Sequence, residues 1–222
     1  MALHFERIGK YMDYYWQGLK MTGMITAVTL LFCIVVTAII ICFRVSRFKV
    51  LNAIAAFYTS FFRGVPVVVQ LFVIYFGSAA FTGNKVALPA VTASIITFVL
   101  NSSAYYAENI RGGILGVDKG QMEAAKALGL GYTKGMIFIV LPQAFRSVMP
   151  ALINTTITLL KNTSVVSQIG VLDIMRSGQM VMNVTYLYFE PLIIVALVYL
   201  TIILLITIVG KTAEGYLNRA VA

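Results

Sequence analysis

Charged residues are what this sequence has least of. Only 11% of its 222 residues are Asp, Glu, Lys or Arg, whereas about a quarter are charged in a typical soluble domain. Hydrophobic residues make up 60% of the chain, and the mean hydropathy is +0.90. This composition excludes an ordinary soluble domain and indicates a protein built for the interior of a lipid bilayer.

Residues that carry chemistry are also scarce. The one histidine, His4, lies near the N-terminus, and the two cysteines, Cys33 and Cys42, share one apolar run. Metal sites need clustered Cys, His or carboxylate ligands, and thiols in apolar surroundings are unreactive. No Gly-rich loop ending in Lys-Ser or Lys-Thr is present to hold nucleotide phosphates. We therefore expect no catalytic residue, no metal site and no cofactor bound by this chain.

Long apolar runs are abundant instead. About 20 apolar residues span the ~30 Å hydrocarbon core as a helix. Four windows of that length have no charge, and a fifth is interrupted only by Lys161. The windows are Met21–Phe43, Gly64–Asn84, Val86–Ala107, Pro191–Gly210 and Ser147–Leu172. We predict an all-α integral membrane protein with five transmembrane helices in a single domain over 1–222.

The expected order of elements follows from these windows. An outer amphipathic lead-in over 1–20 precedes the first helix, and a short turn at 83–85 joins the second helix to the third. Pro66 is expected to kink the second helix. A second outer amphipathic segment is expected at about 171–187. The five helices are expected at about 21–43, 54–81, 87–110, 148–169 and 190–210.

The basic residues indicate the topology. A net charge of +9 could suggest a nucleic-acid partner, but 11 of the 17 basic residues fall in 44–63, 111–146 and 211–222. Cytoplasmic loops carry the excess of Lys and Arg in membrane proteins. We therefore expect the N-terminus outside and the C-terminus in the cytoplasm, and no nucleic-acid partner.

Segment 111–147 is the one long polar stretch expected inside. Asp118 is predicted to cap a helix, with Gln121 as its reciprocal partner. Glu123 lies in the first turn, where the helix dipole favours an anion, and the Ala-rich sequence that follows is strongly helix-forming. Gly129 suits the C-terminal cap. A second short helix is expected over Tyr132–Val140, ending at Leu141-Pro142.

Two interpretations of this polar helix are open. Its side chains Ala124, Ala127, Leu128 and Leu130 form a small apolar surface that another protein could approach closely. Alternatively, the helix is re-entrant or interfacial and packs on its own membrane domain.

Several motifs resemble one known family. EAAKALGLG (123–131) followed by IVLPQAF (139–145) resembles the EAA loop of permease subunits in ATP-binding-cassette (ABC) importers. RGVPVVVQL (63–71), AYYAENIRGGI (104–114) and LLKNTSVVSQIG (159–170) are similar to the polar amino-acid permeases of the His/Glu/Gln/Arg/cystine type. Within that family the loop is the coupling helix that fits a cleft on the ATPase. The positions that match it are Glu123, Ala124, Ala125, Lys126, Gly129, Leu141 and Pro142.

The resemblance implies a type I ABC importer permease fold in a bacterial cell membrane. Two permease subunits, identical or paralogous, would enclose one pathway for a polar amino acid. Two cytoplasmic ATPase subunits would hold the Mg-ATP, and an extracytoplasmic binding protein would deliver the substrate.

Polar residues within the spans suggest where the substrate passes, because such residues usually face a cavity or another helix. Asn101 on helix 87–110 and Asn154 on helix 148–169 are expected at one depth, at 1.5 Å per residue. Hydrogen bonding between helices is the alternative role for such residues. The candidates are Gln70, Asn101, Ser102, Ser103, Asn154, Thr155, Thr158 and Lys161.

Lys161 is the one full charge expected well inside the spans. We expect it to contact the α-carboxylate of the substrate or to act at the gate. Snorkelling to the outer headgroups and a salt bridge to Asp173 are the alternatives. No acidic residue is expected at mid-depth, so the sequence favours a neutral or acidic substrate such as glutamine, glutamate or a cystine-like molecule.

Four residues near the inner interface are assigned structural or transmission roles: Arg63, Pro66, Glu108 and Arg111. Glu108 and Arg111 are one turn apart and are expected to pair.

Two other functions are less consistent with the sequence. A secondary transporter or channel predicts inverted repeats and unwound, charged helices at the midplane, which are not visible here. A membrane-embedded enzyme would need a cluster of His, Asp or Glu within the spans. An ATP-driven permease subunit that does not itself hydrolyse ATP is the best interpretation.

Overall fold

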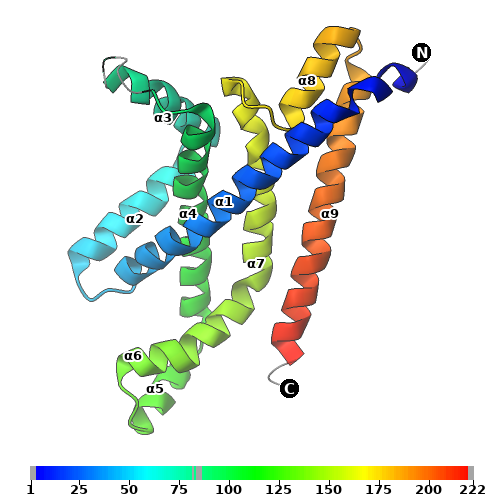
Figure 1. Ribbon diagram of the computed structural model, residues 1–222. Helices are drawn as coiled ribbons and strands as arrows, with labels where there is room; N and C mark the ends of the chain where they lie inside the picture. Colours follow the sequence, from blue (N-terminus) through cyan, green and yellow to red (C-terminus); the bar gives the residue numbers. More distant parts are fainter. Residues whose placement is uncertain (1–3, 82, 84–86, 220–222) are drawn as a thin grey trace.

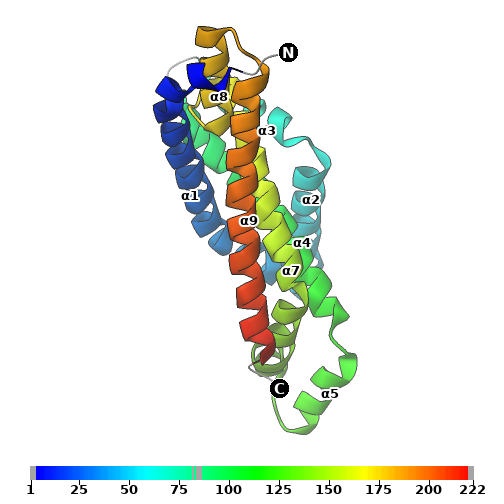
Figure 2. The same cartoon turned by 90° about the vertical axis from the view of Figure 1, so that its right-hand side faces the viewer.

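The computed structural model describes residues 4–81, 83 and 87–219, and all regular structure in these residues is helical. The molecule is elongated (Figures 1 and 2). The N-terminal turns and α8 (Ile174–Thr185) lie at one end of the molecule, and α5 (Lys119–Ala127) lies at the other, which is also the end at which α9 (Phe189–Arg219) finishes. We call these the N-terminal end and the α5 end.

Three long helices form the centre. In Figure 1, α1 (Met12–Arg44) runs diagonally across α4 (Ala90–Gly116) and α7 (Leu141–Asn162) and contacts both. Ile25, Phe98 and Leu159 belong to the buried core between them. The helices α4 and α7 approach closely at Gly113, where an added Cβ would lie 2.9 Å from the Ala144 carbonyl oxygen. Small residues permit such close approach between membrane helices.

The number of spans depends on how they are counted. Within the described residues, three helical stretches are long and apolar enough to cross a membrane: Phe5–Arg44, Tyr132–Ile169 and Phe189–Tyr216. A bent pair of helices supplies a fourth. Helix α4 has 27 residues, which exceeds the roughly 20 needed, but polar residues such as Asn101 and Ser102 lower its hydropathy. It is the remaining member of the expected five.

The second helix is broken rather than kinked at Pro66. Helices α2 (Lys49–Gly64) and α3 (Val67–Phe81) meet at 103°. Proline lacks an N–H and disfavours the helical conformation of the preceding residue, and Val65 is extended with φ −100° and ψ 134°. Gln70 Nε2 donates to the carbonyls of Phe62 and Val65 at 2.9 and 2.8 Å. These bonds satisfy backbone groups that the break sets free.

The expectation that a helix ends at Leu141-Pro142 is wrong. Helix α6 (Tyr132–Gly135) continues through a π-helical turn (Met136–Val140) directly into α7. A π turn replaces the i→i−4 bonds by i→i−5 bonds. It therefore accommodates Pro142, which has no N–H to donate and whose ring would clash in a straight helix.

Other boundaries differ by a few residues. The lead-in forms 3₁₀ turns at Phe5–Arg7 and Gly9–Tyr11 and then joins α1, which begins nine residues earlier than expected. The end of the fourth helix is a 3₁₀ segment, Thr163–Ile169. Helix α8 forms the expected second amphipathic segment. Residues 84 and 85 of the expected turn, and 1–3 of the lead-in, lie outside the described part.

Candidate coupling surface and translocation pathway

Helix α5 is defined at both ends by local hydrogen bonds. Asp118 Oδ1 accepts from the Gly120 N–H at 2.7 Å, so Asp118 is the N-cap as expected. Gln121 is not its reciprocal partner, because Gln121 Oε1 accepts from Gln143 Nε2 on α7 at 3.0 Å. At the other end Gly129 has φ +78°, a conformation that glycine adopts without strain.

The bonds around Gly129 complete a Schellman cap. The Gly129 N–H donates to the Lys126 carbonyl at 2.9 Å, and the Leu130 N–H donates to the Ala125 carbonyl at 3.0 Å. The chain therefore turns sharply after α5 and returns along α6. The predicted role of Gly129 as a helix cap is confirmed.

One face of α5 is packed against α6. Ala125 is fully buried, and a Cβ added at Gly135 would lie 2.9 Å from Met122 Sδ and 3.3 Å from the Ala125 Cβ. Ala125 therefore holds the α5–α6 hairpin together and is not part of an outer surface. Its predicted place in the coupling loop stays a prediction, as a residue that supports the hairpin from inside.

The opposite face of α5 is open. Glu123, Ala124, Lys126 and Ala127 are exposed, and Leu128 has 80% of its area exposed. Within the described part of the chain neither Glu123 nor Lys126 has an ion-pair partner. Helix α5 projects beyond the other helices at its end of the molecule (Figures 1 and 2). We name Glu123, Ala124, Lys126, Ala127 and Leu128 the α5 outer face.

The last two predicted coupling residues lie at the junction with α7. Leu141 is half-buried and Pro142 is exposed. Both belong to the continuous helical connection that joins the α5–α6 hairpin to the long helix α7, with no loop between them.

Glu108 of α4 connects its own helix with α1 and α2. Its Oε2 lies 2.8 Å from Arg111 Nη2, which confirms the predicted pair, and 3.7 Å from Arg63 Nη1 on α2. Its Oε1 lies 3.0 Å from Arg44 Nη2 at the end of α1 and accepts from Thr59 Oγ1 on α2 at 3.1 Å. We name these residues the Glu108 cluster. Arg44 and Thr59 could not be predicted as partners of Glu108, because they are 64 and 49 residues away from it in the chain.

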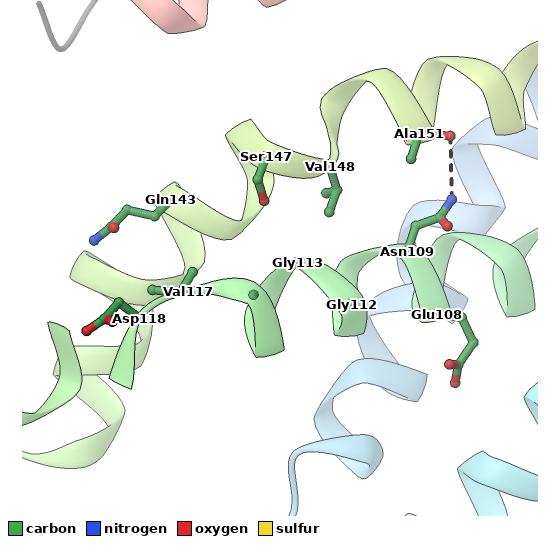
Figure 3. Close-up of a pocket in the computed structure, with 11 residues that line it drawn as sticks. Glu108, Asn109, Gly112, Gly113, Val117, Asp118, Gln143, Ser147, Val148 and Ala151 are labelled. Carbon is green, nitrogen blue, oxygen red and sulfur yellow. Dashed lines mark hydrogen bonds between the residues drawn. The ribbon is translucent and has the colours of Figure 1, made fainter. Parts of the chain in front are cut away.

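A groove of about 570 Å³ runs between α4 and the first half of α7 (Figure 3). Glu108 and Asn109 line it at one end, and Asp118 and Gln143 line it at the other. Asn109 Nδ2 bridges the two helices, with the Ala151 carbonyl at 3.4 Å and Thr155 Oγ1 at 2.9 Å. The groove links the Glu108 cluster to the cap of α5.

A polar cavity of about 340 Å³ lies further along the same two helices. It brings together Asn101 and Ser102 of α4 with Asn154, Thr155 and Thr158 of α7. This confirms that the two groups lie at one level. Tyr105, Asn109 and Asn162 also line the cavity, although they are not among the predicted pathway residues. Helical spacing places Tyr105 and Asn109 four and eight residues after Asn101, and Asn162 eight residues after Asn154, so this spacing could have identified them.

Three predicted pathway residues do not line this cavity. Gln70 lies at the α2–α3 break and accepts from Asn101 Nδ2 at 3.3 Å. Ser103 is fully buried on another face of α4, 2.8 Å from the Tyr58 hydroxyl. Lys161 is exposed on α7, one residue from Asn162 at the cavity.

The alternative salt bridge between Lys161 and Asp173 is not formed. Asp173 is fully buried; it caps α8 by accepting from the Arg176 N–H at 2.8 Å, and it also accepts from the Tyr199 hydroxyl at 3.4 Å. Burial raises the pKa of Asp173 to about 6.

A long helical scaffold, an open polar helix at one end and a polar cavity between two central helices define a membrane transport subunit. Residues 34–221 match the family of binding-protein-dependent transport system inner membrane components, and the chain belongs to this family. It is thus a permease subunit of an ABC importer, a multi-pass membrane protein that works with separate ATPase subunits and a substrate-binding protein.

Similar proteins narrow the family further. The chain is 39% identical to the arginine transport system permease protein ArtQ of Bacillus subtilis, over 98% of this chain and 99% of the relative. It is 38% identical to a putative glutamine transport system permease protein GlnP of Rickettsia felis, over 89% and 90% of the two chains. These relatives confirm the resemblance to amino-acid ABC importer permeases.

The fold is confirmed by a solved structure. The crystal structure of an amino acid ABC transporter with histidines superimposes with a TM-score of 0.90 at 36% identity, covering 97% of this chain and 100% of that chain. The methionine ABC transporter MetNI, in an inward-facing conformation, has the same fold, with a TM-score of 0.73 at 17% identity.

Proposed function

We propose that this chain forms the membrane pathway of an ATP-driven amino-acid importer and receives force from its ATPase through the α5 outer face. One observation carries the proposal. Helix α5 is fixed on one side by Ala125 and Gly135 but presents an unpacked face on the other, where two alanines lie beside the exposed Glu123, Lys126 and Leu128. A helix with such a face, at the tip of the molecule, fits a cleft on another protein.

Force applied to α5 has a continuous route to the spans. Gln121 and Gln143 tie α5 to α7, and the π turn makes α6 and α7 one helical body. The polar cavity lies along α7, so a shift of the hairpin changes the wall of the cavity. Closure of the ATPase pair would then alternate the access to it.

The proposed substrate is a polar amino acid with a neutral or acidic side chain. The cavity offers amide and hydroxyl groups, and no carboxylate of the described residues lines it. Lys161, next to the cavity, would meet the substrate α-carboxylate or act at the gate. Arginine is the second candidate, because the ArtQ relative is named for it.

Assembly and orientation complete the proposal. Two permease subunits, identical or paralogous, would form one pathway, and Mg-ATP would bind to the ATPase subunits and not to this chain. The α5 end would face the cytoplasm, with the N-terminus outside, in a bacterial cell membrane. This orientation is consistent with α5 and the last turns of α9 lying at one end of the molecule (Figures 1 and 2).

Reconstitution tests the proposal. The permease is assembled with its ATPase and binding protein in liposomes, and uptake of glutamine, glutamate, cystine and arginine is compared. Saturable uptake of one neutral or acidic substrate, lowered by Lys161→Met, is expected. Preferential arginine uptake by an importer with two copies of this chain would refute the substrate assignment but not the coupling.

Co-purification tests the coupling. Glu123→Arg reverses a charge on the α5 outer face and should weaken capture of the ATPase. Glu214→Arg, which reverses a charge on α9 at the same end, is the matched control and should leave capture unchanged. Equal capture by both variants would contradict docking at α5.

A further inference from the structure

A second cavity, of about 500 Å³, opens between α1, α4 and α7 and is separate from the polar one. Apolar side chains such as Ile34, Ile41, Phe145 and Leu152 form most of its walls. We name this cavity the α1–α4–α7 cleft. No described segment of the chain fills it.

The polar groups in the cleft are mostly turned away from it. The Tyr106 hydroxyl is within 2.7 Å of Thr156 Oγ1, and Cys33 Sγ points to the Val99 carbonyl at 3.7 Å. The cleft therefore suits a hydrocarbon chain and offers little to a polar solute.

A basic pocket continues the cleft toward the α5 end. Arg44 and Arg111 line this pocket of about 300 Å³, together with Tyr132 and Met136. Each helix supplies residues to both cavities in the same order. On α1, Ile41 and Cys42 line the cleft and Arg44 the pocket; on α4, Ile110 lines the cleft and Arg111 the pocket. The π turn and α7 form the third wall and follow the same order, with Leu141 in the cleft and Met136 in the pocket.

The charge of the pocket is not neutralised. Arg44 and Arg111 share the single carboxylate of Glu108, and Arg63 contacts the same carboxylate from α2. Arg47 lies over the Tyr132 ring at 5.9 Å and has no ion-pair partner within the described residues. A net positive charge thus remains at the mouth of an apolar cleft.

We propose that the α1–α4–α7 cleft and its basic pocket bind one anionic phospholipid from the leaflet at the α5 end, with an acyl chain in the cleft and the phosphate beside Arg44, Arg47 and Arg111. Basic pockets between membrane helices are typical sites for anionic headgroups. The acyl chains of all phospholipids are as apolar as the cleft walls. The positive charge of the basic pocket must therefore supply the preference for an anionic over a zwitterionic lipid. The site requires only that the chain spans a membrane and is independent of the transported substrate.

The test measures which lipids stay bound to the assembled importer. The importer is reconstituted in equimolar phosphatidylglycerol and phosphatidylethanolamine, extracted gently, and analysed by native mass spectrometry. Preferential retention of phosphatidylglycerol is expected. Arg47→Gln should lower this preference about fivefold, as expected for one cation near an anionic headgroup. Lys211→Gln, which removes a cation from α9 at the same end, should not change it.

Two further arms separate the possible occupants. Ala38→Trp fills the cleft without changing charge and should abolish retention of the lipid. Glycerol phosphate should not displace the lipid, because it has no acyl chain. Unchanged phosphatidylglycerol retention in both Arg47→Gln and Ala38→Trp, or displacement by glycerol phosphate, would overturn the proposal. Cross-linking of Cys42, which lines the cleft, to Cys42 of a second permease copy would place that copy in the cleft and would also overturn it.

Discussion

Replacing Glu108 by Gln should destabilise the permease more than any other loss of one carboxylate at the α5 end. The substitution keeps the shape of the side chain but leaves Arg44, Arg63 and Arg111 without their shared counter-ion. Arg44 and Glu108 side chains are only 16% and 11% exposed, so solvent screens this contact poorly. Removing one partner of a buried pair leaves an uncompensated charge, which is more costly than the pair is stabilising.

The magnitude follows from the individual contacts. A hydrogen bond to a charged group contributes about 1.5–3 kcal/mol, and Glu108 accepts two such sets, from Arg44 and Arg111. The Arg111 side chain is 36% exposed and that of Arg63 is 44% exposed, so their contributions are reduced toward the ~0–1 kcal/mol of surface pairs. We expect a total loss of about 2–4 kcal/mol.

The assay is thermal unfolding of the purified permease in detergent. Cys33 is buried and Cys42 is exposed, so in a Cys42→Ser background a thiol-reactive dye reports unfolding through Cys33. A loss of this size lowers the melting temperature by roughly 5–15 °C for a chain of this length. Glu214→Gln serves as the control and should melt like the parent.

A double variant separates charge from packing. Adding Arg44→Gln to Glu108→Gln removes one of the repelling cations. The double variant should therefore lose less stability than the sum of the losses in the two single variants. A melting temperature for Glu108→Gln equal to that of the parent would refute the idea that this carboxylate holds α1, α2 and α4 together.

Three other predictions concern different parts of the molecule. Gly135→Leu should push α5 off α6 at Met122 and abolish substrate-stimulated ATPase activity of the complex. Gly131→Leu, where an added Cβ meets no atom within 4 Å, is the control and should retain most of this activity. Equal activities of the two variants would contradict the close packing of α5 on Gly135. Asn154→Ala should raise the KM for uptake severalfold with little change in the amount of assembled complex, and an unchanged KM would remove Asn154 from the pathway. Because burial raises the pKa of Asp173 to about 6, the folded state holds this proton more tightly than the unfolded chain. This contribution to stability is fully present only below about pH 4 and is lost as the pH rises through about 6, by up to about 3 kcal/mol. Asp173→Asn keeps a side chain that can cap the helix but cannot titrate, so its melting temperature should change less between these pH values. An equal change of melting temperature with pH in both proteins would contradict the raised pKa of Asp173.

The sequence predicted what depends on local pattern. Apolar runs identify α1 and α9, and the Asp118 and Gly129 caps of α5 follow from the preferences of those residue types. The shared level of Asn101 and Asn154 follows from the regular rise of a helix. These features need no knowledge of distant contacts.

Features that depend on distant contacts were missed. Proline has a different effect at two places in this chain: the helix breaks by 103° at Pro66, whereas it continues through a π turn before Pro142. The packing around each proline decides whether the helix breaks or continues. At Pro66, Gln70 satisfies the freed carbonyls and permits the break. In the Glu108 cluster, only the pair of Glu108 and Arg111 within α4 follows a local spacing. The contacts of Glu108 with α1 and α2 have no sequence pattern. Ala125 and Ala124 are equivalent in sequence, and only the fold of the hairpin buries one and exposes the other.

Site-specific cross-linking from α5 tests the central claim most directly. A photoreactive residue at position 128, replacing the exposed Leu128, is introduced into the fully assembled importer in membranes. We expect a cross-link to the ATPase subunit, with a yield that changes when ATP binds. Cross-links that reach only lipid, the permease itself or the binding protein would contradict it.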